Sequence, residues 1–297
     1  MELISTVFVS IKRMNMRAST LSPDRLLDYA NQLPAAPQIM AKLNQMLHDP
    51  NADLEQIGTL LRRDTSLASR IIRVANSPAF RGDGVSSIED ALQRVGFSEV
   101  YRLTGLASVN QLAEIPMSAY GLTATQVSEN ALMTALACES LARRSGADPR
   151  AAYTVGLFRS LGKLVLGSAA AKVPGKDFPA SQGYSLEAWE QHRFGITSAE
   201  AGAIVLKVWG FPDAVVAGVL EQYFSDPSAP NHPMAALVNL ACAIAEEHEL
   251  GLPGEDLAWA PSPMKLTCAK LLKQALAPAG EEAYEQFTVL RAGLTPS

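Results

Sequence analysis

An apolar segment from Tyr153 to Leu166 constrains the fold more than any other stretch of the chain. Its large apolar side chains recur at helical spacing, so the segment is expected to form a helix with one face in the core. Gly156 and Gly162 resemble the ends of a phosphate-binding loop, but five residues separate them where that motif has four, and Leu164 stands where it needs a hydroxyl. Ser160 lacks the strand-turn-helix setting of a nucleophile elbow. The segment is therefore predicted to be a core helix rather than a nucleotide loop or a hydrolase nucleophile.

Signals for helix starts and ends recur along the chain, whereas patterns for strands are nearly absent. Ser22 followed by Pro23 fits the start of a helix, and Thr197 with Glu200 fits a capping box. The pattern predicts an all-α chain. The predicted helices after the first one cover residues 37–47, 54–61, 64–77, 88–96, 99–114, 125–144, 149–171, 201–209, 213–224, 234–248 and 262–276.

The segment 116–123 contains Pro116 and Gly121 and is the predicted boundary between two subdomains. Residues 21–116 would form an N-terminal helical subdomain, and residues 123–297 a C-terminal helical subdomain. Residues 1–20 are expected to be a flexible tail, because their apolar run is too short to cross a bilayer and its cations follow the run instead of preceding it.

The composition favours a reduced, intracellular protein. The 297 residues are 48% hydrophobic and 19% charged, which is enough for a large core. The three cysteines match no zinc pattern, and an odd number makes a poor disulfide framework. A net charge of −5 argues against a surface that binds nucleic acid as a whole. We therefore expect a cytoplasmic protein that has no membrane partner, and nucleic acid is a disfavoured partner.

Six stretches follow one another along the chain in an informative order: Leu33-Pro34 with Pro37, the long string from Asp64 to Ser77, Ile88 to Gly96, Gly156 to Leu166, Glu200 to Ala203, and Trp209 to Pro212. Taken together, these stretches resemble the HDOD domain, a helical bacterial signalling module related to the HD-domain phosphohydrolases. The resemblance spans about residues 33–245 and implies an HDOD fold, in which an N-terminal helical subdomain packs on an HD-like helical subdomain.

The resemblance also implies where the metal ligands of an HD phosphohydrolase would lie. The His-Asp pair of its metal-binding helix is replaced here by Arg159 and Ser160. Arginine keeps its proton and offers only donors, and a neutral hydroxyl is a poor substitute for a carboxylate. The resemblance therefore implies a degenerate pocket with no metal, no cofactor and no catalytic residue. The other positions of this pocket carry Asn130, Ser198, Tyr223 within the stretch 222–224, Asn239 and Cys242.

The expected function is that of a non-catalytic signalling or regulatory module. It would contact a signalling protein, and the degenerate pocket is the expected position for a nucleotide-like small molecule. Arg159 has two expected roles of equal weight in that pocket. Its guanidinium either balances the charge of a phosphate or forms a salt bridge to Glu200 or another local carboxylate.

Two alternative functions stay open. One is an active metal-dependent phosphohydrolase with a rearranged ligand set, namely Glu129, His192, Glu200 and Glu221. The other is a nucleic-acid-binding regulator that uses the densest basic cluster, which is also a possible anion or partner patch: Arg62, Arg63, Arg70 and Arg73. A solvated helix face explains this cluster more simply. Glu190 and Glu200 are a further candidate acid–base pair, but their sequence context shows no sign of burial, and capping explains Glu200 more simply.

Overall fold

The structure is a computed structural model that describes residues 21–33, 36–47, 54–76, 84–112, 115, 117–179, 185–224, 231–255 and 258–291. Regular structure in these ranges is helical throughout, so the all-α prediction is confirmed. Residues 1–20, the predicted tail, lie outside them. In chain order the α-helices are α2 (Pro23–Asn31), α3 (Ala36–Leu47), α4 (Leu54–Leu61), α5 (Thr65–Ala75), α6 (Ile88–Leu112), α7 (Ala124–Ser145), α8 (Pro149–Phe158), α9 (Leu161–Ala170), α10 (Leu186–Phe194), α11 (Ser198–Val208), α12 (Asp213–Leu220), α13 (Pro233–Glu247), α14 (Pro263–Cys268) and α15 (Leu276–Arg291).

Local sequence sets several helix ends. The hydroxyl of Ser22 accepts a hydrogen bond from the N–H of Arg25 at 3.4 Å, at the start of α2. At the start of α11, Thr197 accepts from the N–H of Glu200 at 3.2 Å, and the Glu200 carboxylate accepts from the N–H of Thr197 at 2.8 Å. This is the predicted capping box. Gly96 kinks α6 with a φ of 79°, a conformation that favours glycine, at the residue where the sequence ends one helix.

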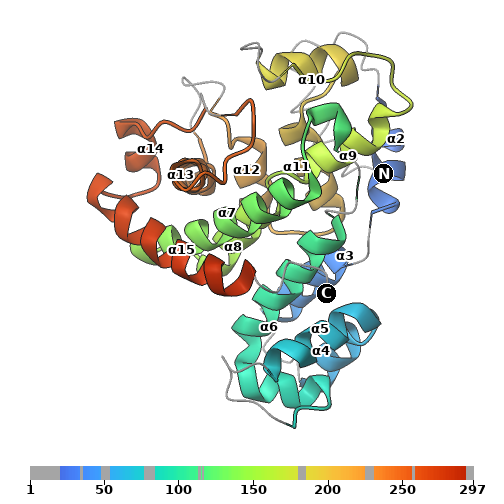
Figure 1. The fold of residues 1–297 in the computed structure, drawn as a ribbon, viewed down its shortest axis with the longest axis vertical. Helices are drawn as coiled ribbons and strands as arrows, with labels where there is room; N and C mark the ends of the chain where they lie inside the picture. Colours follow the sequence, from blue (N-terminus) through green and yellow to red (C-terminus); the bar gives the residue numbers. More distant parts are fainter. Residues whose placement is uncertain are drawn as a thin grey trace.

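The helices form two groups around a central α7 (Figure 1). The helices α3 to α6 gather at one end, and α6 also contacts α7 and α8 of the larger group. Helix α7 packs against α8, α13 and α15. Helix α2 lies beside α9 and α11 in the larger group, and Leu21 donates a backbone hydrogen bond to Phe194 at 3.1 Å. The predicted subdomain boundary at residues 116–123 falls between α6 and α7 and stays a prediction.

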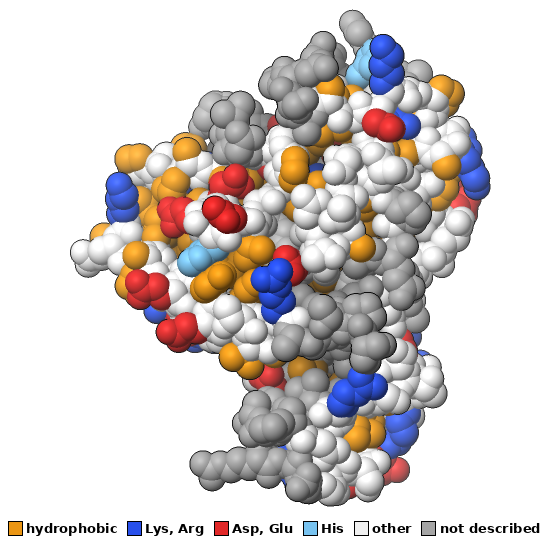
Figure 2. Space-filling view, in the orientation of Figure 1, with side chains coloured by type: hydrophobic (Ala, Val, Ile, Leu, Met, Phe, Trp, Pro, Cys, Tyr) orange, Lys and Arg blue, Asp and Glu red, His pale blue; other side chains and the backbone are white. Residues whose placement is uncertain are grey.

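Charged side chains of both signs are interspersed on the face shown in Figure 2. On this face the lysine and arginine side chains are scattered and form no continuous stripe. Apolar side chains also reach this surface around α13 and α15 (Figure 2). Single exposed apolar side chains are ordinary on protein surfaces. The large ones among the described residues are Leu54, Phe97, Val208, Met264, Leu272, Tyr284 and Val289.

Two helix predictions are wrong. The single helix predicted for residues 149–171 is broken between Phe158 and Leu161, because Ser160 departs from helical geometry with a φ of −96° and a ψ of 7°. At this break the carbonyl of Arg159 accepts a hydrogen bond from the side chain of Gln222 at 3.0 Å. The helix predicted for residues 262–276 ends at residue 268, and the longer α15 follows. Pro278 lies in the first turn of α15, where proline is compatible with a helix.

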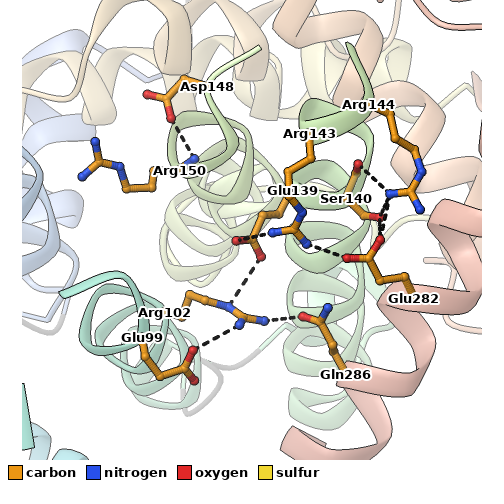
Figure 3. Close-up of polar contacts among 10 residues, drawn as sticks. All are labelled: Glu99, Arg102, Glu139, Ser140, Arg143, Arg144, Asp148, Arg150, Glu282 and Gln286. Carbon is orange, nitrogen blue, oxygen red and sulfur yellow. Dashed lines mark hydrogen bonds and ion pairs between the residues drawn. The ribbon is translucent and has the colours of Figure 1, made fainter. Parts of the chain in front are cut away.

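A polar network joins α6, α7 and α15 (Figure 3). Arg102 of α6 pairs with Glu99 on its own helix at 3.1 Å and with Glu139 of α7 at 3.5 Å. It also donates to the amide oxygen of Gln286 in α15 at 2.5 Å. The last described helix therefore contacts both groups of helices.

Glu282 extends this network along α15 (Figure 3). Its carboxylate accepts hydrogen bonds from Ser140 at 2.7 Å, from Arg143 at 2.8 Å and from Arg144 at 2.7 Å. Partial burial raises the pKa of Glu282, but the three hydrogen bonds outweigh burial and lower that pKa to about 2. The ionised carboxylate therefore helps to hold α15 against α7.

Candidate functional site

Arg159 lies in the core at the junction of α8 and α9, because two glycines let these helices approach their neighbours closely. A Cβ added to Gly156 would lie 2.6 Å from the carbonyl oxygen of Thr134 in α7. A Cβ added to Gly162 would overlap the carbonyl oxygen of Ser198 in α11. The glycines of the sequence motif are thus needed for packing. The side chain of Arg159 is 0% exposed at this junction.

The guanidinium of Arg159 pairs with the carboxylate of Glu255, which follows α13. Its Nη2 lies 2.6 Å from Oε2, and its Nη1 lies 3.3 Å from Oε1. Lys163 forms an ion pair with the same Oε1, and the hydroxyl of Tyr223 donates to it at 2.6 Å. The side chains of Arg159, Lys163 and Glu255 are at most 2% exposed. Arg159, Lys163, Tyr223 and Glu255 together are called the Glu255 cluster below.

Trp259 and Gln222 fix the orientation of the cluster. The ring of Trp259 stacks on Tyr223 with centroids 5.2 Å apart, and the guanidinium of Arg159 lies 5.2 Å from its centroid. Gln222 donates to the carbonyl of Arg159 at 3.0 Å, and Asn239 donates to the carbonyl of Gln222 at 2.7 Å. The guanidinium is therefore held by an aromatic face and a carboxylate together.

Burial and the nearby guanidinium of Arg159 lower the pKa of Lys163, whereas the carboxylate of Glu190 raises it and the ion pair with Glu255 also favours the charged ammonium. Holding two cationic side chains so close together in the core is unfavourable unless anions lie beside them. The site is therefore electrostatically suited to a negatively charged group.

The other predicted pocket residues lie around the cluster. Ser160 accepts from Nη1 of Arg159 at 3.4 Å. The amide of Asn130 donates to the carbonyl of Leu250 at 2.7 Å, in the connection that leads from α13 to Glu255. Cys242 is buried in α13, and burial raises the pKa of its thiol. Their roles as ligand contacts stay predictions.

Ser198 contacts a second buried carboxylate. Glu190 accepts from the N–H of Ser198 at 2.7 Å and from the hydroxyl of Tyr120 at 3.0 Å. Burial raises the pKa of Glu190, and the positive charge of Lys163 opposes that change. Nothing in the sequence around Glu190 indicates this burial. Glu190 does not pair with Glu200, because Glu200 caps α11.

The residues of the pocket do not fit a divalent metal ion. An HD phosphohydrolase needs acceptor ligands there, whereas Arg159 and Lys163 present only donors. The alternative ligand set is also dispersed: Glu200 caps α11, Glu221 accepts from the N–H of His232 at 2.5 Å, and Glu129 forms an ion pair with α15. Within the described ranges, no group of three or more His, Cys, Asp and Glu residues could hold a metal ion.

The basic cluster of the N-terminal helices is only partly free for a partner. Arg62 forms an ion pair with Glu89 of α6. Arg63 and Arg73 are exposed. The side chain of Arg70 lies outside the described part of the structure. The anion or partner patch therefore stays a prediction, with Arg63 and Arg73 as its exposed members that form no ion pair within the described part of the chain.

Comparisons with solved structures show the same fold. An HDOD domain protein of unknown function from Geobacter sulfurreducens has 19% sequence identity and a TM-score of 0.62, over 92% of this chain and 97% of that chain. A "putative signal transduction protein" from Marinobacter aquaeolei VT8 has 22% sequence identity and a TM-score of 0.71, over 98% of this chain and 65% of that chain. A "putative phosphohydrolase" from Shewanella amazonensis SB2B has 23% identity and a TM-score of 0.59, over 87% and 97%.

The family comparison assigns the chain. No protein with a curated description matches it. None of the helices in the described ranges has the length and apolar character needed to cross a membrane. The HDOD domain model matches residues 33–224, so that Arg159, Lys163 and Tyr223 lie within the match while Glu255 lies after it. Because this match covers more than half of the chain, the protein belongs to the HDOD domain family.

Proposed function

We propose that the chain is a non-catalytic HDOD regulator that acts through contact with another signalling protein. The Glu255 cluster is the observation that carries this proposal. At the position of the His-Asp pair of an HD phosphohydrolase, Arg159 directs two donors at a carboxylate. A guanidinium and an ammonium offer no lone pair to a divalent cation and repel its charge. Activation of a metal-bound water therefore has no support at this position.

The site of this chain, and not the names of its relatives, favours regulation over catalysis. One similar structure is named a signal transduction protein and another a phosphohydrolase, so the names point in both directions. A regulatory role fits the HDOD family as a whole. The loss of the acceptor ligands distinguishes the two functions for this chain.

A protein partner is favoured over nucleic acid. The net charge of the chain is −5, and basic side chains on the face in Figure 2 are interspersed with acidic ones. Arg62 already pairs with Glu89. Nucleic-acid binding draws most of its affinity from groups of Lys and Arg that neutralise phosphates together.

Metal analysis and hydrolysis assays test the proposal. The full chain, purified without a histidine tag, is expected to contain no stoichiometric Mn, Fe or Zn. It is also expected to hydrolyse cyclic dinucleotides and alarmones no faster than Arg159→Ala does. Stoichiometric metal together with turnover above that variant would refute the proposal.

Affinity capture from the source cells tests the partner. Wild type is expected to retain a reproducible signalling protein. Arg73→Ala is expected to reduce its recovery, because Arg73 is an exposed arginine of the predicted patch in the N-terminal group of helices. Arg25→Ala removes an exposed arginine from α2 and is the matched control. Equal recovery with both variants would exclude the patch from recognition.

A further inference from the structure

The donors and the acceptor of the Glu255 cluster come from different parts of the chain. Arg159 and Lys163 lie at the junction of α8 and α9, and Tyr223 follows α12. All three belong to residues 33–224, which match the HDOD domain. Glu255 lies beyond the match, in the connection between α13 and α14. The HDOD helices thus carry a complete set of donors, and a later segment supplies the anion.

The site holds more hydrogen-bond donors than the single carboxylate of Glu255 can accept with good geometry. Oε1 of Glu255 receives Arg159 Nη1 at 3.3 Å, the Tyr223 hydroxyl at 2.6 Å, and the ammonium of Lys163. Two more buried donors, Nε of Arg159 and Nε1 of Trp259, have no hydrogen-bond partner in the part of the chain that the structure describes. An unmet buried donor is unfavourable, because it has lost its hydrogen bond to water and gained none in the protein. The second buried carboxylate, Glu190, is already held by donors of its own.

We propose that Arg159, Lys163 and Tyr223 form a binding site for the terminal phosphate of a small molecule, and that Glu255 is the internal anion which this phosphate displaces. A terminal phosphate has three free oxygens and up to two negative charges, so it accepts from the present donors and from the unmet ones as well. The inference rests on the proposed non-catalytic function, because in a metal site the ion, and not the arginine, would contact the phosphate.

The segment that carries Glu255 can be loosened without altering a single donor. Gly254 has a φ of 84°, which is strained for any other residue. A Cβ at this position would also lie 2.7 Å from Cζ of Phe178. Gly254→Ala is therefore expected to push the segment out of place while Arg159, Lys163 and Tyr223 stay in position. It is an independent way to release Glu255.

Displacement is a competition between a tethered carboxylate and a free anion. A tethered group acts at an effective concentration of about millimolar or higher, so wild type is expected to bind phosphate weakly. Removal of the Glu255 carboxylate ends this competition. Binding of inorganic phosphate to Glu255→Ala is therefore expected to be at least about tenfold tighter than to wild type.

Calorimetric titration of the full chain with inorganic phosphate tests the site. Glu255→Ala and Gly254→Ala are both expected to bind more tightly than wild type, Glu255→Ala by the larger factor. Glu247→Gln removes an exposed carboxylate from α13 and is expected to bind as wild type does. Glu255→Ala/Lys163→Met is expected to lose the gain. Equal binding by wild type, Glu255→Ala and Gly254→Ala, or a gain that survives Lys163→Met, would overturn the proposal.

Melting temperatures measured with phosphate and with acetate distinguish a phosphate-binding site from a site that accepts any small carboxylate. At equal concentration, phosphate is expected to raise the melting temperature of Glu255→Ala more than acetate does. An equal or smaller rise with phosphate would overturn the assignment to phosphate. Should Glu255→Ala unfold, phosphate is expected to restore its circular dichroism, because ligand binding stabilises the folded state. Failure of this rescue would count against the site.

The same preparations distinguish failure of this inference from failure of the proposed function. The proposed function fails through bound metal and turnover, whatever the phosphate titrations give. The phosphate site fails through unchanged titrations, even when metal and turnover are absent.

Discussion

Replacement of Gly162 by alanine is expected to destabilise the protein by up to about 2 kcal/mol. Helix α9 passes α11 so closely that the new Cβ would overlap the carbonyl oxygen of Ser198 and lie 2.7 Å from the N of Gly202. Both neighbours are backbone atoms, so the two helices must move apart. Overpacking costs about 1–3 kcal/mol. Alanine gains about 1 kcal/mol of helix propensity over glycine, so the steric cost prevails.

Urea denaturation followed by circular dichroism measures this change, because the free energy of unfolding is the product of the slope and the midpoint concentration. Gly280→Ala is the matched control in α15. Its Cβ would lie 3.2 Å from Cγ2 of Ile244 and 3.6 Å from the His248 ring, which are side-chain atoms that can shift. This control is expected to be neutral or to gain up to about 1 kcal/mol. A Gly162→Ala midpoint equal to that of Gly280→Ala would refute the close approach of α9 and α11.

Three further variants probe other contacts. Arg159→Met is expected to destabilise the fold by about 1.5–3 kcal/mol, because the buried carboxylate of Glu255 loses one of its two cationic partners and keeps Lys163; urea denaturation beside the exposed control Arg63→Met checks this, and equal midpoints would contradict a buried ion pair. Glu282→Gln is expected to lower stability above pH 4.5, the unfolded pKa, and to differ progressively less from wild type as the pH falls towards the folded pKa of about 2. Melting temperatures across this window measure the difference, which would stay constant if the carboxylate had no role. Thr197→Ala removes the N-cap of α11 and is expected to cost about 1 kcal/mol in the same urea assay; no loss would show that the capping box contributes nothing.

The features that the sequence predicted well depend on neighbouring residues. The capping box of Thr197 and Glu200 closes over three residues, and the kink at Gly96 follows from the conformational freedom of glycine at that position. Helical periodicity likewise acts within a few turns. Each of these signals depends on residues that are close together in the sequence, so the all-α structure and most helix starts could be predicted.

The features that the sequence did not predict depend on residues far apart in the chain. Glu255 lies 96 positions from Arg159, and nothing around it indicates that a carboxylate enters the core there. At the break between α8 and α9, the carbonyl of Arg159 accepts a hydrogen bond from Gln222, which is 63 positions away. A salt bridge from Arg159 to Glu200 or another nearby carboxylate is one of two roles predicted from the sequence. The structure shows a salt bridge to Glu255 instead of Glu200. Only the packing of α13 and its following segment selects Glu255.

The late position of Glu255 in the chain has a consequence for biosynthesis. Translation produces Arg159 and Lys163 well before the carboxylate that neutralises them, and it produces Gln286 184 positions after its partner Arg102. A nascent chain that ends before Glu255 lacks the carboxylate that pairs with both cations at that junction. Because domains generally fold as units during synthesis, we expect the core around α8 and α9 to close only after α13 and its following segment have left the ribosome.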